Sequence, residues 1–341
     1  MIPSAYAATL LGDDPGLRTI VIVGGSGFVG RKLATELARR TEPVRCGVRS
    51  PKGQTKVSPE GVVEQQADIR DYNSLVALFR GATSVVNLAT TTRQINPQTF
   101  HDTFFRGTHN LVAAMRAAGV RRLIHVGVVA TDRYRRDPRF PYLYWKQRAT
   151  DLVCASGLDY TVFETSLIFG RGDQLLTAVA LALKALPVVP IAGHLAAHTR
   201  FQPVSVQDVV YCLAQSLDDR TTIGRCYSLT GPEAYEFIDL ARIVDAFLGT
   251  KRRIVIVPPW PVRLLLRAGS ALMRRPPITT EMLDLAGIDS CCDSRLTYEH
   301  FGLYPRCVAD SLDYLRSVGA QDFRAWMWGS LRGQAGSSLW E

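Results

Sequence analysis

The sequence has few features that would cross-link the chain by disulfides or bind a metal. Its seven cysteines form no C-x-x-C pair and no zinc-type spacing, and its six histidines form no ligand spacing. Several cysteines lie in apolar runs, where a buried thiol behaves as a small hydrophobic side chain, and the adjacent Cys291 and Cys292 are the unusual case. We therefore predict no metal site and no disulfide scaffold, and we expect a reducing compartment.

Long apolar runs and targeting signals are also missing. The longest apolar stretch, residues 175–191, is interrupted by Lys184, Pro187 and Pro190 and is too short to span a bilayer. Residues 1–17 have neither the regions of a secretory signal nor the arginines of a transit peptide. The sequence therefore predicts a cytoplasmic protein with no signal peptide and no transmembrane helix, open to peripheral attachment at the inner face of a membrane.

The composition is that of an ordinary globular protein with a basic surplus. The 341 residues are 47% hydrophobic and 21% charged, which suits one large α/β domain with a smaller one appended. Lysine and arginine exceed the acidic residues by nine. This surplus fits a phosphorylated cofactor, an anionic membrane surface or a solvated basic face. Since no basic-aromatic module accompanies it, a nucleic-acid partner is not predicted.

Short apolar runs alternate with helical patterns through the first half of the chain. The predicted strands are residues 18–24, 44–49, 61–67, 83–89, 122–129, 159–163 and 225–229, and the predicted helices are 31–40, 71–79, 97–118, 142–155 and 206–217. Such alternation is typical of a parallel doubly wound sheet. We therefore expect an α/β Rossmann fold with a smaller, mainly helical C-terminal lid domain.

Beyond Gly170 the alternation loosens. Pro187, Pro190 and Gly193 predict a loop, and the chain from about Pro232 is predicted to be helical. We assign residues 18–170 and 203–232 to the NAD(P)-binding Rossmann domain. Residues 171–202 and 233–330 are assigned to a substrate or lid domain facing the carboxyl edge of the sheet.

A glycine-rich loop stands between the first strand and the first helix. Gly24-Gly-Ser-Gly27-Phe-Val-Gly30 supplies a tight turn, close approach of backbone to pyrophosphate, and close packing of helix on strand. The helix start then offers free N–H groups and the positive end of its dipole to phosphates. We predict that Gly24, Ser26, Gly27, Phe28, Val29 and Gly30 bind a dinucleotide.

The end of the second strand indicates which dinucleotide is bound. Sites that prefer NAD place an acidic residue about twenty positions after the loop, whereas this chain has Arg49 there. A guanidinium suits a 2′-phosphate, and Arg45 and Lys52 are expected to add positive charge nearby. We therefore favour NADP(H), with NAD(H) still open because an arginine can also stack on adenine.

Two later strand ends complete the predicted cofactor site. Asp68 and Ile69 close the third strand, where they can border the adenine, although Asp68 is equally suited to forming a turn. Leu88, Ala89 and Thr90 close the fourth strand beside the adenosine ribose. We include all five residues in the cofactor-binding set.

Tyr142 and Lys146 form a candidate catalytic pair. They stand at i and i+4 and therefore share a helix face. An ammonium near a phenol lowers the pKa of the phenol toward the range where it exchanges protons with a carbonyl or alcohol. Lys146 can also reach the nicotinamide ribose. An incidental tyrosine and lysine at this spacing is the competing interpretation.

The loop and this pair together resemble the extended and atypical branches of the short-chain dehydrogenase/reductase superfamily, over roughly residues 18–318. Residues 158–161, 166–173, 200–208 and 227–232 resemble the branch containing the nucleotide-binding accessory subunit of respiratory complex I and its bacterial relatives. The resemblance implies a bound nicotinamide dinucleotide that, in this branch, is held mainly as a structural or sensing ligand.

The chain departs from the enzymes of this superfamily at two places. Such enzymes usually carry a serine after the fifth strand, but here Gly127 and Val128 occupy that place and Thr131 is the nearest hydroxyl. They also commonly have Arg-Pro after the sixth strand, where this chain has Glu164 and Thr165. Loss of one oxyanion donor costs on the order of 3 kcal/mol of transition-state stabilisation. We therefore expect weak or no turnover.

Residues 260–275 form a basic amphipathic stretch. Arg263, Arg267 and Arg274 share one helical face, with leucines and Met273 around the rest. The pattern fits a membrane interface or docking surface, or else an ordinary lid helix with its polar face in water.

Two functions remain open. One is an NADP(H)-binding component with little turnover at a membrane-associated respiratory complex or an anionic membrane surface. The other is an active NADPH-dependent reductase or epimerase that uses Tyr142 and Lys146 on a small carbonyl, quinone-like or isoprenoid substrate. Without the usual serine, the sequence leaves the enzyme assignment uncertain.

Overall fold

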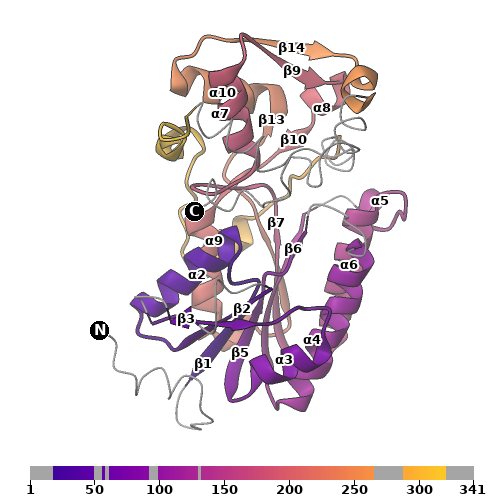
Figure 1. Ribbon diagram of the computed structural model, residues 1–341, viewed down its shortest axis with the longest axis vertical. Helices are drawn as coiled ribbons and strands as arrows, with labels where there is room; N and C mark the ends of the chain where they lie inside the picture. The colour runs from indigo at the N-terminus through magenta and orange to yellow at the C-terminus, as the bar shows by residue number, and fades with distance from the viewer. Residues whose placement is uncertain are drawn as a thin grey trace.

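The computed structural model describes residues 18–49, 56–57, 61–91, 99–129, 132–264 and 287–319. Within these ranges an eight-stranded sheet has the order β12-β7-β6-β5-β1-β2-β4-β3 (Figure 1), and its pairs are parallel except for antiparallel β3 and β4. The strand bounds are β1 Thr19–Val23, β2 Val44–Val48, β3 Lys56–Val57, β4 Val63–Gln66, β5 Ala82–Asn87, β6 Arg122–Val128, β7 Asp159–Thr165 and β12 Arg225–Leu229. This is the Rossmann order, in which ligands bind beyond the carboxyl ends of the strands, where the order reverses between β1 and β5.

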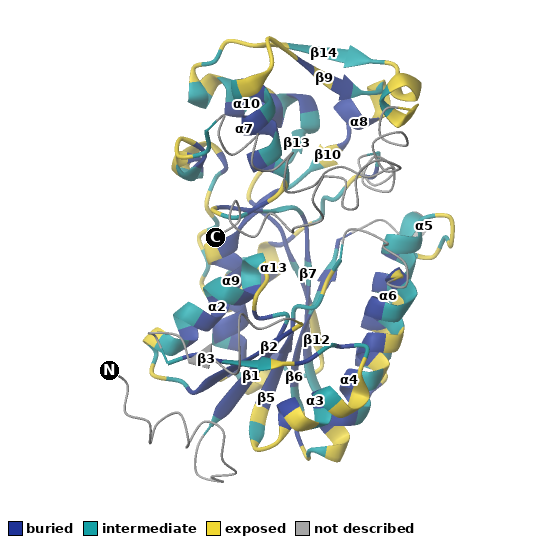
Figure 2. Cartoon of the chain, in the orientation of Figure 1, coloured by how far each residue is buried: buried dark blue, intermediate teal, exposed yellow. Residues whose placement is uncertain are grey.

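Both faces of the sheet are covered by helices, because successive side chains of each buried strand point to opposite faces. Ile20 and Ile22 of β1 join one apolar core, and Val21 and Val23 join the other. The first core lies under α2 (Phe28–Arg39), α9 (Val206–Ser216) and α13 (Arg295–Phe301), and the second under α3 (Tyr72–Phe79), α4 (Gly107–Ala117) and α6 (Pro141–Cys154). Figure 2 shows the strands buried between helices whose outer faces are exposed.

The helix predicted over residues 97–118 begins differently from the expectation. Residues 92–98 lie outside the described ranges, and the chain then makes a π-helical turn, η1 (His101–Arg106), that runs directly into α4. Phe100 and Phe104 stack with their ring centroids 5.7 Å apart. Because π-turns reposition side chains along a helix, this turn sets how those rings face α6.

A smaller unit stands above the carboxyl ends of the strands (Figure 1). It contains α7 Leu175–Ala185, β9 Val188–Ala192, α8 His194–Ala197, β10 Arg200–Phe201, β13 Tyr235–Glu236, α10 Phe237–Leu248 and β14 Arg253–Val257. Apolar side chains of α7 and α10 pack with Val308, Leu312 and Leu315 in a separate core. The division of the chain into residues 18–170 with 203–232 and 171–202 with 233–330 remains a prediction.

The structure corrects the loop predicted around Pro187, Pro190 and Gly193. This segment is strand β9, and it pairs in parallel with β14, which lies in a region predicted to be helical. The side chains of β9 alternate between exposed and buried, which is the strand periodicity that the prolines obscured. Pro190 is tolerated because each strand of a two-stranded sheet is an edge strand, where one side of the backbone needs no N–H donor.

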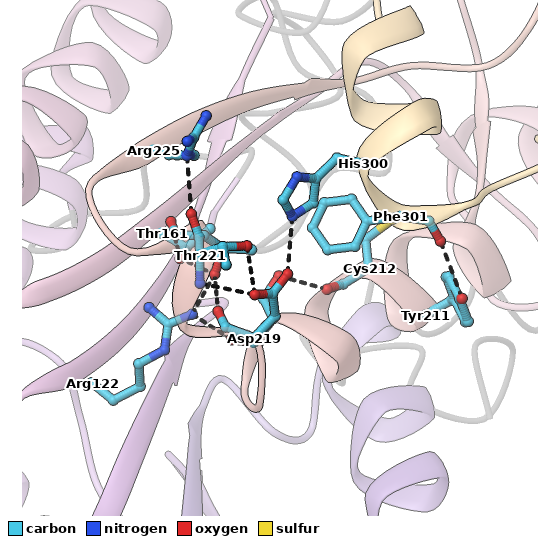
Figure 3. Close-up of polar contacts among 11 residues, drawn as sticks. Arg122, Thr161, Tyr211, Cys212, Asp219, Thr221, Arg225, His300 and Phe301 are labelled. Atoms are coloured by element: carbon cyan, nitrogen blue, oxygen red, sulfur yellow. Dashed lines mark hydrogen bonds and ion pairs between the residues drawn. The ribbon is translucent and has the colours of Figure 1, made fainter.

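Figure 3 shows a polar network that includes Arg122, Asp219 and His300. It ties together the amino ends of β6, β7 and β12, which lie at the opposite edge of the sheet from the glycine loop. Arg122 Nη1 donates to the Asp159 carbonyl at 2.8 Å, and its Nη2 donates to Thr222 Oγ1 at 2.9 Å. Asp219 accepts from the Thr221 backbone N–H at 2.8 Å and lies 3.0 Å from His300 Nε2. The network therefore connects the end of α9 with α13 and the last strand of the sheet.

None of the helices in the described part of the chain combines the length and the apolar character needed to cross a membrane.

Candidate functional site

The glycine loop folds into the turn that the sequence predicted. Gly24 has φ +86°, a conformation that only glycine adopts readily, and its carbonyl accepts from the Gly27 N–H at 3.0 Å. Helix α2 begins at Phe28 with Gly27 as its N-cap, and no side chain in the described residues caps it. Its first backbone N–H groups therefore point out of the helix start without a side-chain acceptor, as an anion-binding helix start requires.

Two glycines of the loop are required by close packing. A Cβ on Gly30 would lie 2.4 Å from the Gly24 carbonyl oxygen, and one on Gly25 would lie 2.5 Å from Cys46 Sγ. Both contacts are far inside van der Waals distance, so any side chain would push α2 away from β1 and β2. Gly27, in contrast, is exposed with φ −77°, and its added Cβ would meet the Gly24 oxygen at 3.1 Å.

A cavity opens beside the loop at the carboxyl ends of β1, β2, β4 and β5. Most of the predicted cofactor residues line it. The lining residues are Val23, Gly24, Ser26, Gly27, Gly47, Arg49, Ala67, Asp68, Ile69, Arg70, Leu88, Ala89, Thr90 and Thr103. Phe28, Val29 and Gly30 are not in this lining, because Phe28 and Val29 pack against the core under α2 and Gly30 is buried.

Positive charge gathers around Asp68 at one end of the cavity. Asp68 and Arg70 form a two-pronged ion pair, with Nε–Oδ1 at 3.0 Å and Nη2–Oδ2 at 2.6 Å. This pairing lowers the pKa of Asp68, and the charge of Arg49 lowers it further. Asp68 also accepts from the Arg70 backbone N–H, so it forms a turn and lines the cavity at the same time.

Arg70 was missed by the sequence analysis. The sequence could have indicated it, because an arginine two residues after an aspartate at a strand end can fold back onto that carboxylate.

The other expected cation, Arg45, is not in the site. Its side chain is buried on the α3 side, where Nη1 donates to the Leu78 and Arg80 carbonyls at 2.9 Å each. The physical reason is position along the strand, since Arg45 lies at the amino end of β2, whereas Arg49 follows its carboxyl end, where the cavity opens. Lys52 lies outside the described residues.

Tyr142 and Lys146 lie one turn apart on α6, against the aromatic rings that the π-turn presents. The Tyr142 ring meets Phe100 and Phe104 edge-on, with centroid distances of 5.5 and 5.4 Å. Lys146 is buried, and its Nζ lies 5.0 Å from the centroid of Phe104. Both side chains are therefore held in an apolar setting.

This setting reverses the expected titration of Tyr142. Burial raises the pKa of Tyr142, although a hydrogen bond from the Thr90 side chain opposes the rise. Burial also lowers the pKa of Lys146 to about 8. The expected lowering of the phenol pKa is therefore wrong, because desolvation outweighs the hydrogen bond from Thr90. Their roles in catalysis and ribose binding remain predictions.

Two side chains pack closely around the place of the usual serine. A Cβ on Gly127 would meet Thr150 Oγ1 at 3.2 Å and Glu164 Cγ at 3.4 Å. Glu164 lies within β7 and forms an ion pair with Arg135, with Oε2–Nη2 at 3.1 Å. Thr131 lies outside the described residues. Gly127 therefore supplies no side-chain hydroxyl where an oxyanion donor is usual.

His125 is a buried neighbour that the sequence analysis did not single out. Asn87 Nδ2 lies 3.1 Å from His125 Nδ1, across the β5–β6 pair. Among the described residues, His125 Nε2 has no hydrogen-bond partner. Burial and the nearby charge of Lys146 lower the pKa of His125 to about 3, so the ring is neutral in the folded protein. The Asn87 amide N–H donates to His125 Nδ1, so the single proton of the neutral ring lies on Nε2. Asn87 thereby fixes the tautomer of His125.

Comparison with known proteins agrees with this geometry. A family model described as NAD(P)H-binding matches residues 24–169. The mitochondrial NADH-ubiquinone oxidoreductase 40 kDa subunit of Neurospora crassa is 24% identical over 310 residues, covering 89% of this chain and 80% of its own. The photosystem II assembly factor Ycf39 of Guillardia theta is 22% identical over 314 residues, covering 87% and 93%.

A solved structure shares the fold. A nucleoside-diphosphate-sugar epimerase from Staphylococcus aureus superposes with a TM-score of 0.68 at 19% identity, covering 88% of this chain and all of its own. The Rossmann fold and the family resemblance predicted from the sequence are therefore confirmed. The chain thus contains an NAD(P)H-binding domain, and it is similar to the 40 kDa subunit of NADH-ubiquinone oxidoreductase and to Ycf39.

Proposed function

We propose that this protein binds NADP(H) as a structural or sensing ligand, with weak or no turnover. The observation that carries the proposal is the setting of Tyr142. Its ring is fixed against Phe100 and Phe104, its hydroxyl is hydrogen-bonded to Thr90, and its pKa is raised. A general acid or base works best with a pKa near the working pH, and this phenol is moved the other way.

The closed serine position supports the same proposal. At Gly127 the surrounding space is occupied by Thr150 and Glu164, so the fold leaves little room for the missing hydroxyl. Gly127 itself has no side-chain donor for a carbonyl substrate that develops negative charge there. Electrostatic stabilisation of an oxyanion is usually the largest single contribution to such chemistry.

The preference for NADP(H) over NAD(H) is the finer part of the proposal. Arg49 and Arg70 both line the cavity, and the carboxylate that could hold ribose hydroxyls is already paired with Arg70. A guanidinium binds phosphate through two parallel hydrogen bonds. The two arginines therefore support a 2′-phosphate at this end of the cavity.

The partner is proposed from the relatives. One is a subunit of an NADH-ubiquinone oxidoreductase and another is an assembly factor. We propose by analogy that this chain acts as an accessory or assembly component of a membrane-associated respiratory complex or at an anionic membrane surface, with the dinucleotide stabilising the surface that the partner contacts.

An active reductase or epimerase is the second candidate. Tyr142 and Lys146 remain one turn apart on α6, and Thr90 of the cofactor cavity contacts the Tyr142 hydroxyl. Entry of nicotinamide and substrate could rearrange these side chains, because catalytic hydrogen bonds often tighten only in the complex. Its substrate would be a small carbonyl, quinone-like or isoprenoid compound.

One experiment separates the two candidates. Purified protein is given NADPH, and both binding stoichiometry and loss of NADPH absorbance are measured against a panel of quinones and small carbonyls. Tyr142→Phe removes the hydroxyl, and Tyr144→Phe on the same helix is the matched control. We expect wild type, Tyr142→Phe and Tyr144→Phe all to bind NADPH stoichiometrically, and none of them to oxidise it. Oxidation of NADPH that Tyr142→Phe abolishes and Tyr144→Phe retains would establish the reductase instead.

A further inference from the structure

Two cysteine thiols meet at a position far from the cofactor cavity. Cys154 is the last residue of α6, and Cys226 lies on β12, the edge strand of the sheet. Their Sγ atoms are 3.8 Å apart although 72 positions separate them in the chain. This distance is van der Waals contact, and rotation of the side chains would be needed to reach the S–S bond length of about 2 Å.

The fold explains why these two thiols meet. Tyr227 and Leu229 of β12 belong to the core under α2 and α9, so the alternating Cys226 faces the α6 side of the sheet. That side of an edge strand is incompletely covered, and Cys226 is exposed while Cys154 is half-buried. A small oxidant can therefore reach the pair from solvent.

The surroundings of Cys154 favour its thiolate. Cys226 and the Tyr160 hydroxyl both hydrogen-bond to Cys154 Sγ, and these bonds lower the pKa of Cys154 to about 7. The same contact raises the pKa of Cys226. Cys46 and Cys212 differ sharply, because burial raises the pKa of each to about 12. Reactive cysteines are partly exposed with a lowered pKa, whereas buried ones are inert.

We propose that Cys154 and Cys226 form a reversible intramolecular disulfide that joins the end of α6 to β12. The co-reactant is a small-molecule disulfide of the glutathione type. The Cys154 thiolate attacks one sulfur of glutathione disulfide, forms a mixed disulfide, and releases one glutathione thiolate. Cys226 then loses its proton and attacks Cys154 Sγ, which releases the second glutathione. The two protein thiols are oxidised, and glutathione disulfide is reduced to two glutathione molecules.

The bond would act on the helix that also carries Tyr142 and Lys146. Oxidation fixes the C-terminal end of α6 to the edge of the sheet, and reduction releases it. The pair is thus a redox-controlled clip at the C-terminal end of the helix whose N-terminal half carries Tyr142 and Lys146. The disulfide requires only the two thiols, so this proposal does not depend on whether the protein turns over the dinucleotide.

The test uses the full chain in glutathione buffers near neutral pH. Trypsin cleaves after Arg148 and Arg225, so the two thiols fall in different peptides that a disulfide would hold together. Non-reducing mass spectrometry should find this linked pair in the wild-type monomer, and dithiothreitol should separate it. Cys291→Ala is the matched control with another partly exposed thiol removed, and it should retain the link.

Cys226→Ala supplies the second measurement. Without its resolving partner, Cys154 should stop at the mixed disulfide with glutathione. The pH midpoint for alkylation of Cys154 should also rise from about 7 toward the ordinary range of a thiol, because the hydrogen bond from Cys226 is gone. Separate glutathione adducts on both thiols of the wild type, or links between chains only, would overturn the clip. An unchanged midpoint in Cys226→Ala would remove Cys226 as the partner.

Discussion

At the scale of single residues, Arg49 is the side chain on which the proposed preference for NADP(H) depends. Arg49→Glu places a carboxylate where a 2′-phosphate is proposed to bind, while leaving the glycine loop intact. Hydrogen bonds to charged groups contribute about 1.5–3 kcal/mol, so the Kd for NADPH should rise roughly tenfold to a hundredfold. The Kd for NADH should change much less. Both constants are measured by fluorescence titration.

The control for this prediction is a charge reversal of the same kind at a distance from the cavity. Arg242→Glu lies on α10, where Arg242 pairs with Asp239. It should leave both Kd values unchanged. Equal losses of NADPH and NADH affinity in Arg49→Glu would contradict the 2′-phosphate assignment, because they would show that Arg49 binds a part common to both cofactors.

Lys146 should make stability depend on pH. Its pKa is about 8 in the folded protein against 10.5 ordinarily. Between these values the unfolded chain retains a proton that the folded chain has released, so the unfolding free energy rises with pH. The shift corresponds to a gain on the order of 3 kcal/mol across this window. Urea unfolding from pH 7 to 10 should show the rise in wild type, and Lys146→Met should lose it.

Lys251→Met tests whether the rise belongs to Lys146. Lys251 is exposed, so removing it should leave the pH dependence of wild type in place. If wild type and Lys146→Met gave parallel curves across the window, the lysine would be solvated rather than held in its apolar setting.

The residues of the site show what a sequence can and cannot predict. The turn of the glycine loop and the place of Arg49 beside the cavity were predictable because they follow from backbone geometry and from position at a strand end. The titration of Tyr142 was not, because it depends on Phe100 and Phe104, which reach the tyrosine through a π-turn in another helix. The prediction for Arg45 failed for a simpler reason, since this residue lies at the amino end of β2 and the cavity opens at the carboxyl end.

At the scale of elements, the network of Figure 3 should contribute measurably to stability. Asp219→Ala removes the cap of the short helix η2 (Arg220–Thr222) together with the contact to His300 on α13. Loss of such a cap costs about 1 kcal/mol. The pKa of Asp219 is lowered, chiefly by its hydrogen bonds to Thr221. Its contribution is therefore present at neutral pH and lost as acid protonates it. Urea unfolding at neutral and acidic pH checks both points.

Asp218→Ala is the neighbouring control. Asp218 is exposed and pairs with Arg18 on the surface, and such pairs contribute little. Its removal should change the unfolding free energy by less than about 0.5 kcal/mol. An equal loss in both variants would show that charge near η2 matters rather than the network.

Elements differed in how well they could be predicted. The parallel strands and their helices have long, consistent periodicity and were placed within a few residues. Strand β9 was read as a loop because two prolines suggest a break, yet its pairing with β14 needs few N–H donors. Only the tertiary arrangement shows that residues 188–192 have a partner at 253–257, since no local pattern connects them.

At the scale of the whole molecule, the basic surplus invites a membrane test. Trp260 and Leu264 are 69% and 63% exposed and lie one turn apart, beside Arg263. Arg267 and Arg274 lie outside the described residues. Each arginine near an anionic surface contributes about 1 kcal/mol, so replacing Arg263, Arg267 and Arg274 with Gln should weaken binding roughly a hundredfold. Sedimentation with phosphatidylserine vesicles measures this.

Three exposed arginines elsewhere provide the comparison. Replacing Arg121, Arg139 and Arg242 with Gln lowers the net charge by the same amount and leaves residues 260–275 unchanged. These changes should leave most of the vesicle binding intact. Similar losses in both triple variants would mean that the net charge attracts the vesicles, and binding to neutral vesicles as well would point to Trp260 and Leu264 alone.

The dinucleotide should stabilise the folded molecule as a whole, because it binds the folded chain and not the unfolded one. At a concentration one hundred times its Kd, NADPH should add about 2.7 kcal/mol to the unfolding free energy. Gly27→Val should abolish this gain while leaving the unliganded protein folded, since Gly27 is exposed and its φ of −77° suits any residue. Gly30→Val should instead prevent folding, because its side chain would collide with the Gly24 carbonyl. Thermal unfolding with and without NADPH measures all three proteins. If Gly27→Val kept the full gain, the pyrophosphate would bind somewhere other than this loop, and the glycines would serve only to pack α2 against the sheet.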